Sequence, residues 1–139
     1  MPAPTPDADL ATKIATALGA GYTVGTNIFV GAPRKIGDGV PHLAIFCNST
    51  GGPSPYQFTP GAGSVSQISY YGVQVFMRGN VEAFLAGQTI VRAIRDGVHK
   101  ATVSGYINCE VVESDPNFIG EDDLEHPMWT LNVKMWREV

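Results

Sequence analysis

The first candidate for a catalytic site in the sequence is a pair of a cysteine thiol and a histidine imidazole. Cys47 follows His42 by five positions, and His99 offers a second imidazole farther along the chain. A thiol activated by a histidine base is the usual arrangement of a cysteine nucleophile. No other catalytic signature accompanies this pair, and Cys47 lies in an apolar run that is typical of a buried strand. We therefore expect Cys47, like Cys109, to be a small apolar core residue.

A second group combines acidic side chains with one histidine: Glu121, Asp122, Asp123, Glu125 and His126. Such side chains offer the oxygen and nitrogen ligands that hard metals or zinc accept. The stretch lacks the glycine and glutamate spacing of a calcium-binding loop, so we interpret it as a solvated acidic loop. The GAGS stretch at 61–64 is not a phosphate loop, because no Lys-Ser or Lys-Thr pair follows it. The sequence thus predicts no catalytic site, no cofactor and no metal.

Composition narrows the class of protein. The chain has 139 residues, of which 44% are hydrophobic and 16% charged, against a usual charged share of ~25%. This length predicts one domain over residues 1–139, and the low charge favours a subunit of an assembly. The net charge of −4 argues against a broad nucleic-acid-binding surface, which would be basic.

The sequence also bears on location. It has no run of 18 apolar residues and no secretory signal, so we expect neither a membrane span nor export. Two cysteines are too few for a disulfide framework, which fits a reducing cytosol.

The stretch from Tyr70 to Lys100 predicts a strand, a corner and a helix. Side chains alternate over residues 70–78 with the period of a strand. Asn80 is the expected N-cap of the helix, because its side-chain oxygen can accept from the free amides of the first turn. Beyond the corner, apolar residues recur at helical spacings and define one face: Val81, Phe84, Leu85, Val91, Ile94 and Val98.

Other segments supply a first helix and further strands. Pro6 at the first helical position and Thr5 as its cap predict a helix after an extended N-terminal arm over residues 1–5. A glycine at position 19 or 21 ends this helix. Apolar or alternating runs predict strands at 23–31, 42–48, 105–113 and 128–137, with a brief strand at 118–119.

This order of elements predicts an α+β fold, with two helices packed on one face of a mainly antiparallel sheet. The run at 42–48 is apolar in both phases, which predicts a central strand covered on both faces. The expected core comprises Leu43, Ile45, Val73, Val75, Phe84, Val91, Ile94, Trp129 and Leu131.

A long loop is expected to project from this fold over residues 49–69. The stretch is rich in Pro, Gly and Ser and has no sustained period, and such loops are usually functional or disordered. It is either a mobile linker or an arm that orders against a neighbouring subunit. The candidate interface residues in the loop and in the acidic segment are Tyr56, Phe58, Val65, Ile68, Glu121, Asp122 and Asp123.

Several stretches together resemble a family of bacteriophage minor capsid proteins with roles in tail termination or head–tail connection. The residues that carry the resemblance are TNIFVGAP at 26–33, HLAIFCNSTGGPSP at 42–55, VQVFMRGN with the amphipathic helix after it at 73–98, and the late strand MWTLNVKMW at 128–136. They occur in the same order over roughly residues 10–137.

The resemblance implies a structural virion protein, not an enzyme. Such a tail terminator forms a ring, expected to be a hexamer, on the last ring of the tail tube. It stops tube polymerisation and presents a surface to the head connector. The implied partners are further copies of itself, the tail tube protein and a connector or stopper protein, with DNA only as cargo in the lumen.

Two alternatives remain open from the sequence. Within the virion class, the chain could be another neck or stopper protein or a tail-tube subunit. Outside that class, it could be a small cytosolic ligand-binding domain or an enzyme that uses Cys47 and His42.

Overall fold

The computed structural model describes residues 5–37, 39–58 and 66–138. Two helices occur in this part of the chain, α1 (Pro6–Leu18) and α2 (Phe84–Val98). The strands are β1 (Ile28–Val30), β2 (Ala44–Phe58), β3 (Ser66–Arg78), β4 (Asn108–Val111), β5 (Asn117–Glu121) and β6 (Pro127–Glu138). None of the described helices has both the length and the apolarity needed to cross a bilayer.

The strands form one mixed sheet in the order β1-β2-β3-β6-β4, and β5 also pairs with β6. β1 runs parallel to β2, whereas the other pairs are antiparallel. Residues 127–130 of β6 pair with β5, and residues 133–136 pair with β4. β6 therefore joins two short edge strands to the rest of the sheet, and the predicted α+β fold is confirmed.

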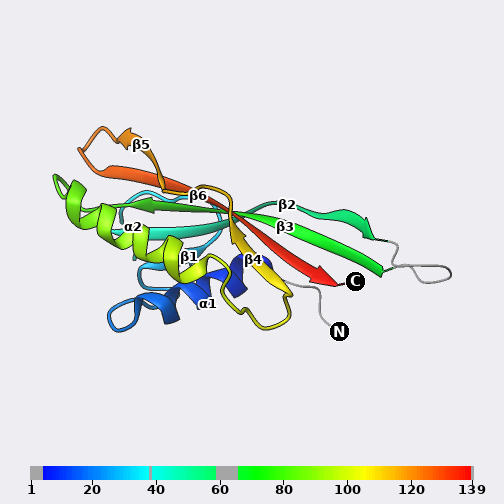
Figure 1. Ribbon diagram of the computed structural model, residues 1–139. Helices are drawn as coiled ribbons and strands as arrows, with labels where there is room; N and C mark the ends of the chain where they lie inside the picture. Colours follow the sequence, from blue (N-terminus) through cyan, green and yellow to red (C-terminus); the bar gives the residue numbers. More distant parts are fainter. Residues whose placement is uncertain (1–4, 38, 59–65, 139) are drawn as a thin grey trace.

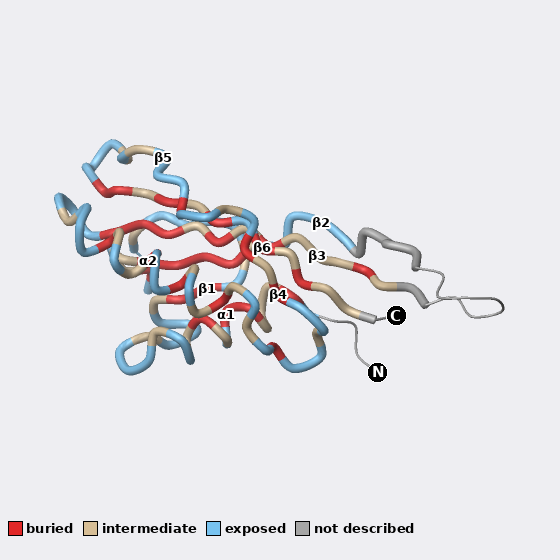
Figure 2. Tube along the Cα trace, viewed as in Figure 1, coloured by how far each residue is buried: buried red, intermediate tan, exposed pale blue. Residues whose placement is uncertain are grey.

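Both helices cover the same face of the sheet (Figure 1). α1 contributes Leu10 and Ile14 to the core, and α2 contributes an apolar stripe of Gly87, Val91, Ile94 and Val98. The sheet contributes alternate side chains, as the period of a strand requires, among them Val73, Val75, Met77, Trp129, Leu131, Val133 and Met135. Figure 2 shows red, buried stretches along the inner strands.

A smaller cluster covers part of the other face. Val40 packs there with Phe29, Ala44 and Phe46, and Phe76 lies against them. β2 is therefore buried on both faces over its first residues, as the doubly apolar sequence predicted. Farther along β3 and β6 the residues of that second face are mostly half-buried.

The prediction of a loop over residues 49–69 is wrong for the residues in this range that the structure describes. β2 continues to Phe58 and β3 begins at Ser66, so these segments form the arms of a hairpin that extends beyond the helices (Figure 1). Register shifts between Ser49 and Gly51 and between Gly51 and Ser54 let the strand absorb its glycines. These bulges break the two-residue period, which is why the sequence looked irregular. Residues 59–65 lie outside the described part, as do residues 1–4 of the expected arm.

The N-terminus of α2 also differs from the prediction. The helix begins at Phe84 with Ala83 as its N-cap, and no side chain caps it. Asn80 instead belongs to a turn in which its carbonyl accepts from the Ala83 amide at 3.2 Å. Glu82 in this turn has a φ of 55°, which is incompatible with a right-handed helix. At α1, Pro6 and the terminal Gly19 occupy the predicted positions, although Thr5 makes no side-chain cap.

Two predicted core residues are exposed in part. Leu43 is half-buried, and Phe84 is 39% exposed. Leu85 and Val81, which were expected on the buried face of α2, are also exposed. The reason is the helix register, because a stripe through Gly87, Val91, Ile94 and Val98 places Leu85 on a neighbouring face.

Candidate interaction surfaces

Cys47 and His42 do not form a nucleophile–base pair. Cys47 is fully buried in β2, and burial, with a smaller effect of Asp7, raises the pKa of its thiol to about 12. Cys109 is buried in β4, and burial raises the pKa of its thiol to about 11. Protonated thiols of this kind are poor nucleophiles at neutral pH. The prediction that both cysteines belong to the core is confirmed.

The histidines have structural partners. His99, just beyond α2, accepts a hydrogen bond at Nδ1 from the Val111 amide at 3.1 Å and so ties the helix end to β4. Nδ1 of His42 lies 2.9 Å from Nε2 of His126, whose ring is fully buried. His126 in turn has Nδ1 2.9 Å from the Asp122 carboxylate. A chain of Asp122, His126 and His42 therefore runs from the acidic turn to the start of β2.

The Asp122 carboxylate can only accept, so Nδ1 of His126 is the donor in their hydrogen bond. The direction of the hydrogen bond between Nε2 of His126 and Nδ1 of His42 depends on the tautomer. His42 also lines an open groove with Tyr22, Asn27 and Asn80.

Asp122 holds the acidic segment in a defined turn. One of its carboxylate oxygens accepts from the amides of Leu124 and His126, each at 2.9 Å. Partial burial alone would raise the pKa of Asp122, but the hydrogen bonds from His126 and Leu124 outweigh it and lower the pKa below the ordinary range. No group of three or more metal-type ligands occurs among the described residues. The acidic side chains of Glu121, Asp123 and Glu125 are exposed to solvent, as predicted, and Asp122 holds the backbone between them in an ordered turn.

Arg78, at the end of β3, fixes the long connection between β1 and β2. Its guanidinium donates to the carbonyls of Arg34, Pro41 and His42 at 2.8–2.9 Å. Arg78 is 6% exposed, and this burial lowers its pKa, while the charge of Asp122 acts in the opposite direction. A buried cation that satisfies three carbonyls keeps the loop closed over the second face of the sheet.

An exposed apolar surface covers the end of the molecule at which α2 begins. We call it the apolar end; it comprises Val81, Phe84, Leu85, Phe118, Ile119 and Leu124, with exposed fractions from 39% to 78%. Phe84 and Phe118 meet edge to face with ring centroids 5.0 Å apart, and both lie against buried Trp129. Trp129 donates through its indole to Gln88 at 2.7 Å. The two exposed phenylalanine rings thus connect this surface to the hydrophobic core through their contacts with Trp129.

The predicted interface residues divide between the two ends of the sheet. Tyr56 and Phe58 lie on the outer arm of β2, and Ile68 pairs with Tyr56 across the hairpin. The side chains of Tyr56 and Phe58 and the whole of Val65 lie outside the described part.

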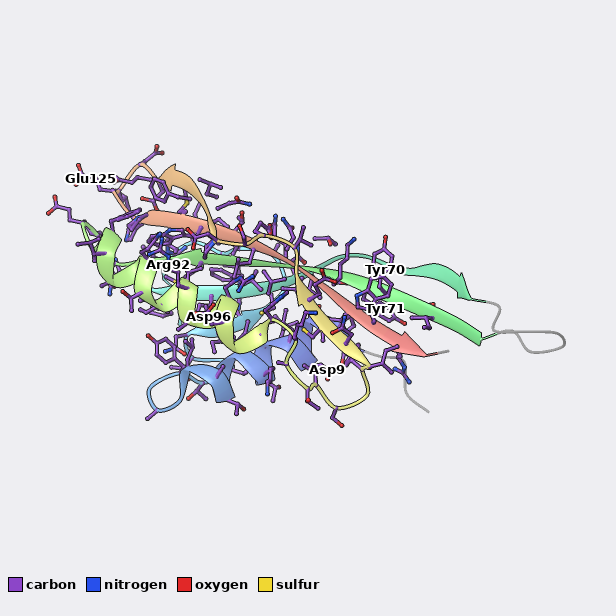
Figure 3. The ribbon with its side chains drawn as sticks, viewed as in Figure 1. Asp9, Tyr70, Tyr71, Arg92, Asp96 and Glu125 are labelled. Atoms are coloured by element: carbon purple, nitrogen blue, oxygen red, sulfur yellow. The ribbon has the colours of Figure 1, made fainter. Side chains whose placement is uncertain are left out.

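Glu121, Asp122 and Asp123 lie at the opposite end, where Figure 3 labels Glu125. They border the apolar end, which the sequence interpretation missed. The missed signal was the pattern of apolar residues set among acids in FIGEDDLE at 118–125.

Comparison with known proteins shows a similar fold in a virion. A chain of the solved structure described as "Virion of native gene transfer agent (GTA) particle" matches with a TM-score of 0.51 and 10% sequence identity. The match covers 96% of this chain and 94% of that chain. No protein-family model and no curated protein matches the sequence. At this identity the likeness concerns the fold, from the first helix to the last strand.

Proposed function

We propose that this chain is a structural protein of a phage-like virion and, more specifically, a tail terminator at the head–tail junction. In this proposal, copies of the chain close into a ring, a hexamer, on the last ring of the tail tube. The ring stops tube polymerisation and joins the tube to the head connector or stopper protein. The protein assembles in the host cytoplasm and remains in the virion, and DNA only passes through its lumen.

The observation that carries the proposal is the fold likeness to a chain of a gene transfer agent virion particle, because it extends over nearly all of both chains. The more specific proposal of a tail terminator rests in addition on the sequence resemblance in the stretches at 26–33, 42–55 and 73–98. Those stretches include β1, the start of β2, and the β3–α2 unit, which together form the centre of the fold.

The chemistry of the described residues supports a role without turnover. Both thiols are buried with raised pKa values. The rings of His42 and His126 are hydrogen-bonded to each other, and His99 accepts a hydrogen bond from the backbone of β4. A net charge of −4 also suits a ring through which DNA slides, because a lumen rich in Lys and Arg would bind phosphates strongly.

The test is a tube-capping assay. Purified tail tube protein is polymerised with and without this protein, and tube lengths and tube ends are measured by electron microscopy. We expect the protein to limit tube length and to place a ring at one end. A variant without residues 52–66, which shortens the β2–β3 hairpin, should stay folded by circular dichroism but fail to attach.

Other outcomes select other functions. If the protein itself polymerises into open tubes, it is a tail-tube subunit. If it binds filled heads and leaves tube growth unchanged, it is a neck or stopper protein. Tubes of unlimited length with bare ends, together with no binding to heads, would contradict a virion role.

A further inference from the structure

We infer that the hydrogen bond between His42 and His126 is an acid-sensitive latch, which opens when both imidazoles are protonated. The latch joins two segments that are far apart in the sequence. His42 lies in the connection between β1 and β2, and His126 lies in the turn between β5 and β6. The latch acts within a single subunit, so it does not depend on the proposed assembly.

The two rings meet nitrogen to nitrogen. Nδ1 of His42 lies 2.9 Å from Nε2 of His126, and the ring centroids are 5.1 Å apart. The centroid separation exceeds the nitrogen–nitrogen distance, as it does when rings meet end to end and not face to face. Each ring therefore presents one nitrogen to the other, at a distance that fits a single hydrogen between them.

The number of hydrogens in this bond does not depend on the tautomer. Whichever ring donates, one hydrogen lies between the two facing nitrogens. Nδ1 of His126 carries another hydrogen, which it donates to Asp122 at 2.9 Å. The remaining nitrogen of the pair, Nε2 of His42, can take up a proton while the bond between the rings stays intact. The closed latch therefore accommodates one added proton.

A second added proton has no place in the closed latch. An imidazolium carries a hydrogen on each nitrogen, so two imidazolium rings would bring two hydrogens against each other. They would also place like charges on facing nitrogens 2.9 Å apart, and such charges repel. The pair therefore takes up its two protons in separate steps, and the second step requires the rings to part.

The charges closest to the pair do not compensate a second positive charge. Asp122 is the carboxylate that accepts from His126, and its charge also acts on the buried guanidinium of Arg78. Arg78 donates to the His42 carbonyl at 2.9 Å, so it places a further cation beside the same pair. One carboxylate thus serves a guanidinium and two imidazoles.

The other charged groups in this region lie toward solvent. Lys35 and Asp123 line one cavity with Arg78, and their charges are opposite in sign. Glu121 and Glu125 flank the turn and are exposed, so water and salt screen their charges. These groups therefore leave the second positive charge on the pair uncompensated.

His42 is the ring that can move. It is exposed, whereas His126 is fully buried. Arg78 holds the His42 carbonyl, so the rings can part by rotation of the His42 side chain alone. The ring then turns into the open groove that it lines with Tyr22 and Asn80, where no carboxylate occurs among the described lining residues. The turn that carries His126 thereby loses its side-chain link to the connection before β2.

Acid favours the open state. The open latch binds one proton more than the closed latch, so lowering the pH shifts the equilibrium toward opening. Below the range of a free imidazole, ~6.5, the opening constant should rise about tenfold for each pH unit. The Asp122 carboxylate still accepts from the amides of Leu124 and His126, so the turn keeps its shape but is held less firmly.

Nitrogen-15 NMR of the histidine rings tests the proton count in the full-length protein. At about pH 7.5 we expect the hydrogen between the rings as a protected ring N–H signal. Toward pH ~5, which is above the lowered pKa of Asp122, both rings should become imidazolium and this signal should vanish. A protected signal that persists after both rings are charged would contradict the latch.

Two variants then test which histidine governs the opening. His42→Asn removes the second proton but keeps a hydrogen-bonding group. The asparagine amide reaches the position of Nδ1 and can donate or accept, so it suits His126 in either protonation state. His99→Asn is the matched control, because His99 also uses Nδ1, toward the Val111 amide, and lies outside the latch.

Hydrogen exchange over residues 121–127, corrected for the intrinsic effect of pH on exchange, measures the opening. In the wild type and in His99→Asn, we expect exchange to rise about tenfold per pH unit between pH ~6 and ~5. In His42→Asn we expect a change of less than about twofold. Circular dichroism at both pH values checks that the variants fold.

Three exchange results would overturn the inference. The first is exchange over residues 121–127 that does not change with pH in the wild type. The second is an equal change in the wild type and in His42→Asn, and the third is loss of the change in His99→Asn, which would make His99 its source. The NMR titration uses the wild type alone, so it decides the question even if His42→Asn does not fold.

Discussion

Gly87 of α2 lies directly against the indole of Trp129 in β6. A Cβ atom at position 87 would overlap two carbons of the ring, Cζ3 and Cη2. Trp129 is fully buried and held by Gln88, so it has no room to retreat. The absence of a side chain at Gly87 thus sets how closely the helix approaches the sheet.

Gly87→Ala should therefore destabilise the protein. Overpacking costs about 1–3 kcal/mol, and the better helix propensity of alanine returns up to ~1 kcal/mol of it. Urea unfolding followed by tryptophan fluorescence measures the change. Ala86→Ser, at the exposed neighbouring position, is the control and should unfold close to the wild-type midpoint. A Gly87→Ala protein more stable than the wild type would mean that the helix can shift away from Trp129.

Arg78→Met should loosen the connection between β1 and β2. The substitution leaves the carbonyls of Arg34, Pro41 and His42 without their donor, for an expected loss of about 2–4 kcal/mol. Hydrogen exchange should show faster exchange over residues 34–42. Arg92→Ala, which breaks an exposed ion pair with Asp115, is the control and should leave both readouts near wild type. Unchanged exchange in the Arg78 variant would show that the loop is held by other contacts.

Both cysteines should resist alkylation in the native protein. A pKa raised from 9.0 to about 12 lowers the thiolate fraction of Cys47 about a thousandfold at neutral pH. Iodoacetamide labelling followed by mass spectrometry should show slow labelling of the native protein and rapid labelling of both thiols in urea. Rapid native labelling at Cys47 would instead support the cysteine-enzyme alternative.

The same thiols make stability depend on pH on the alkaline side. Because folding raises the pKa of Cys47, its contribution is intact below pH 9 and is lost as the pH rises from 9 toward 12. Cys47→Ala should flatten the fall in urea midpoint over this range. If the wild type and the variant fall in parallel, other groups govern alkaline unfolding.

Asp122 should stabilise the protein at neutral pH and lose this effect in acid. Its pKa is lowered in the folded state, so the stabilisation is present above the unfolded pKa near 3.8 and disappears as the pH falls below it. The urea midpoint of the wild type should therefore fall as the pH drops below about 3.8, and Asp122→Asn should flatten this fall. The adjacent Asp123→Asn is the control, because Asp123 is exposed, and it should follow the wild-type curve. If the urea midpoints of Asp122→Asn and Asp123→Asn changed equally with pH, the hydrogen bonds of Asp122 would not be the source of the stabilisation.

The sequence predicted the layers of this fold better than its ends. Periodicity located the buried faces of β3 and β6, because alternation over eight or more residues leaves little choice of register. It failed at Leu85, since apolar residues that serve a surface look the same as those that serve a core. It failed again over residues 49–58, because bulges at Gly51 and Gly52 conceal the strand period.

The candidate surfaces were predictable only in part. Glu121 and Asp123 were singled out from their acidity, and both are exposed beside the apolar end. The chain from Asp122 through His126 to His42 joins residues 84 positions apart. Only the fold brings them together, so no local pattern could have shown it.

β6 has a consequence for how the protein is made. It lies between β3 on one side and β4 and β5 on the other, yet it follows all three along the chain. A nascent chain on the ribosome therefore exposes the edge of β3 and two unpaired strands until residues 127–138 have emerged. The complete sheet therefore forms only after most of the described chain has been made, and until then the edge of β3 is open to pairing with other chains.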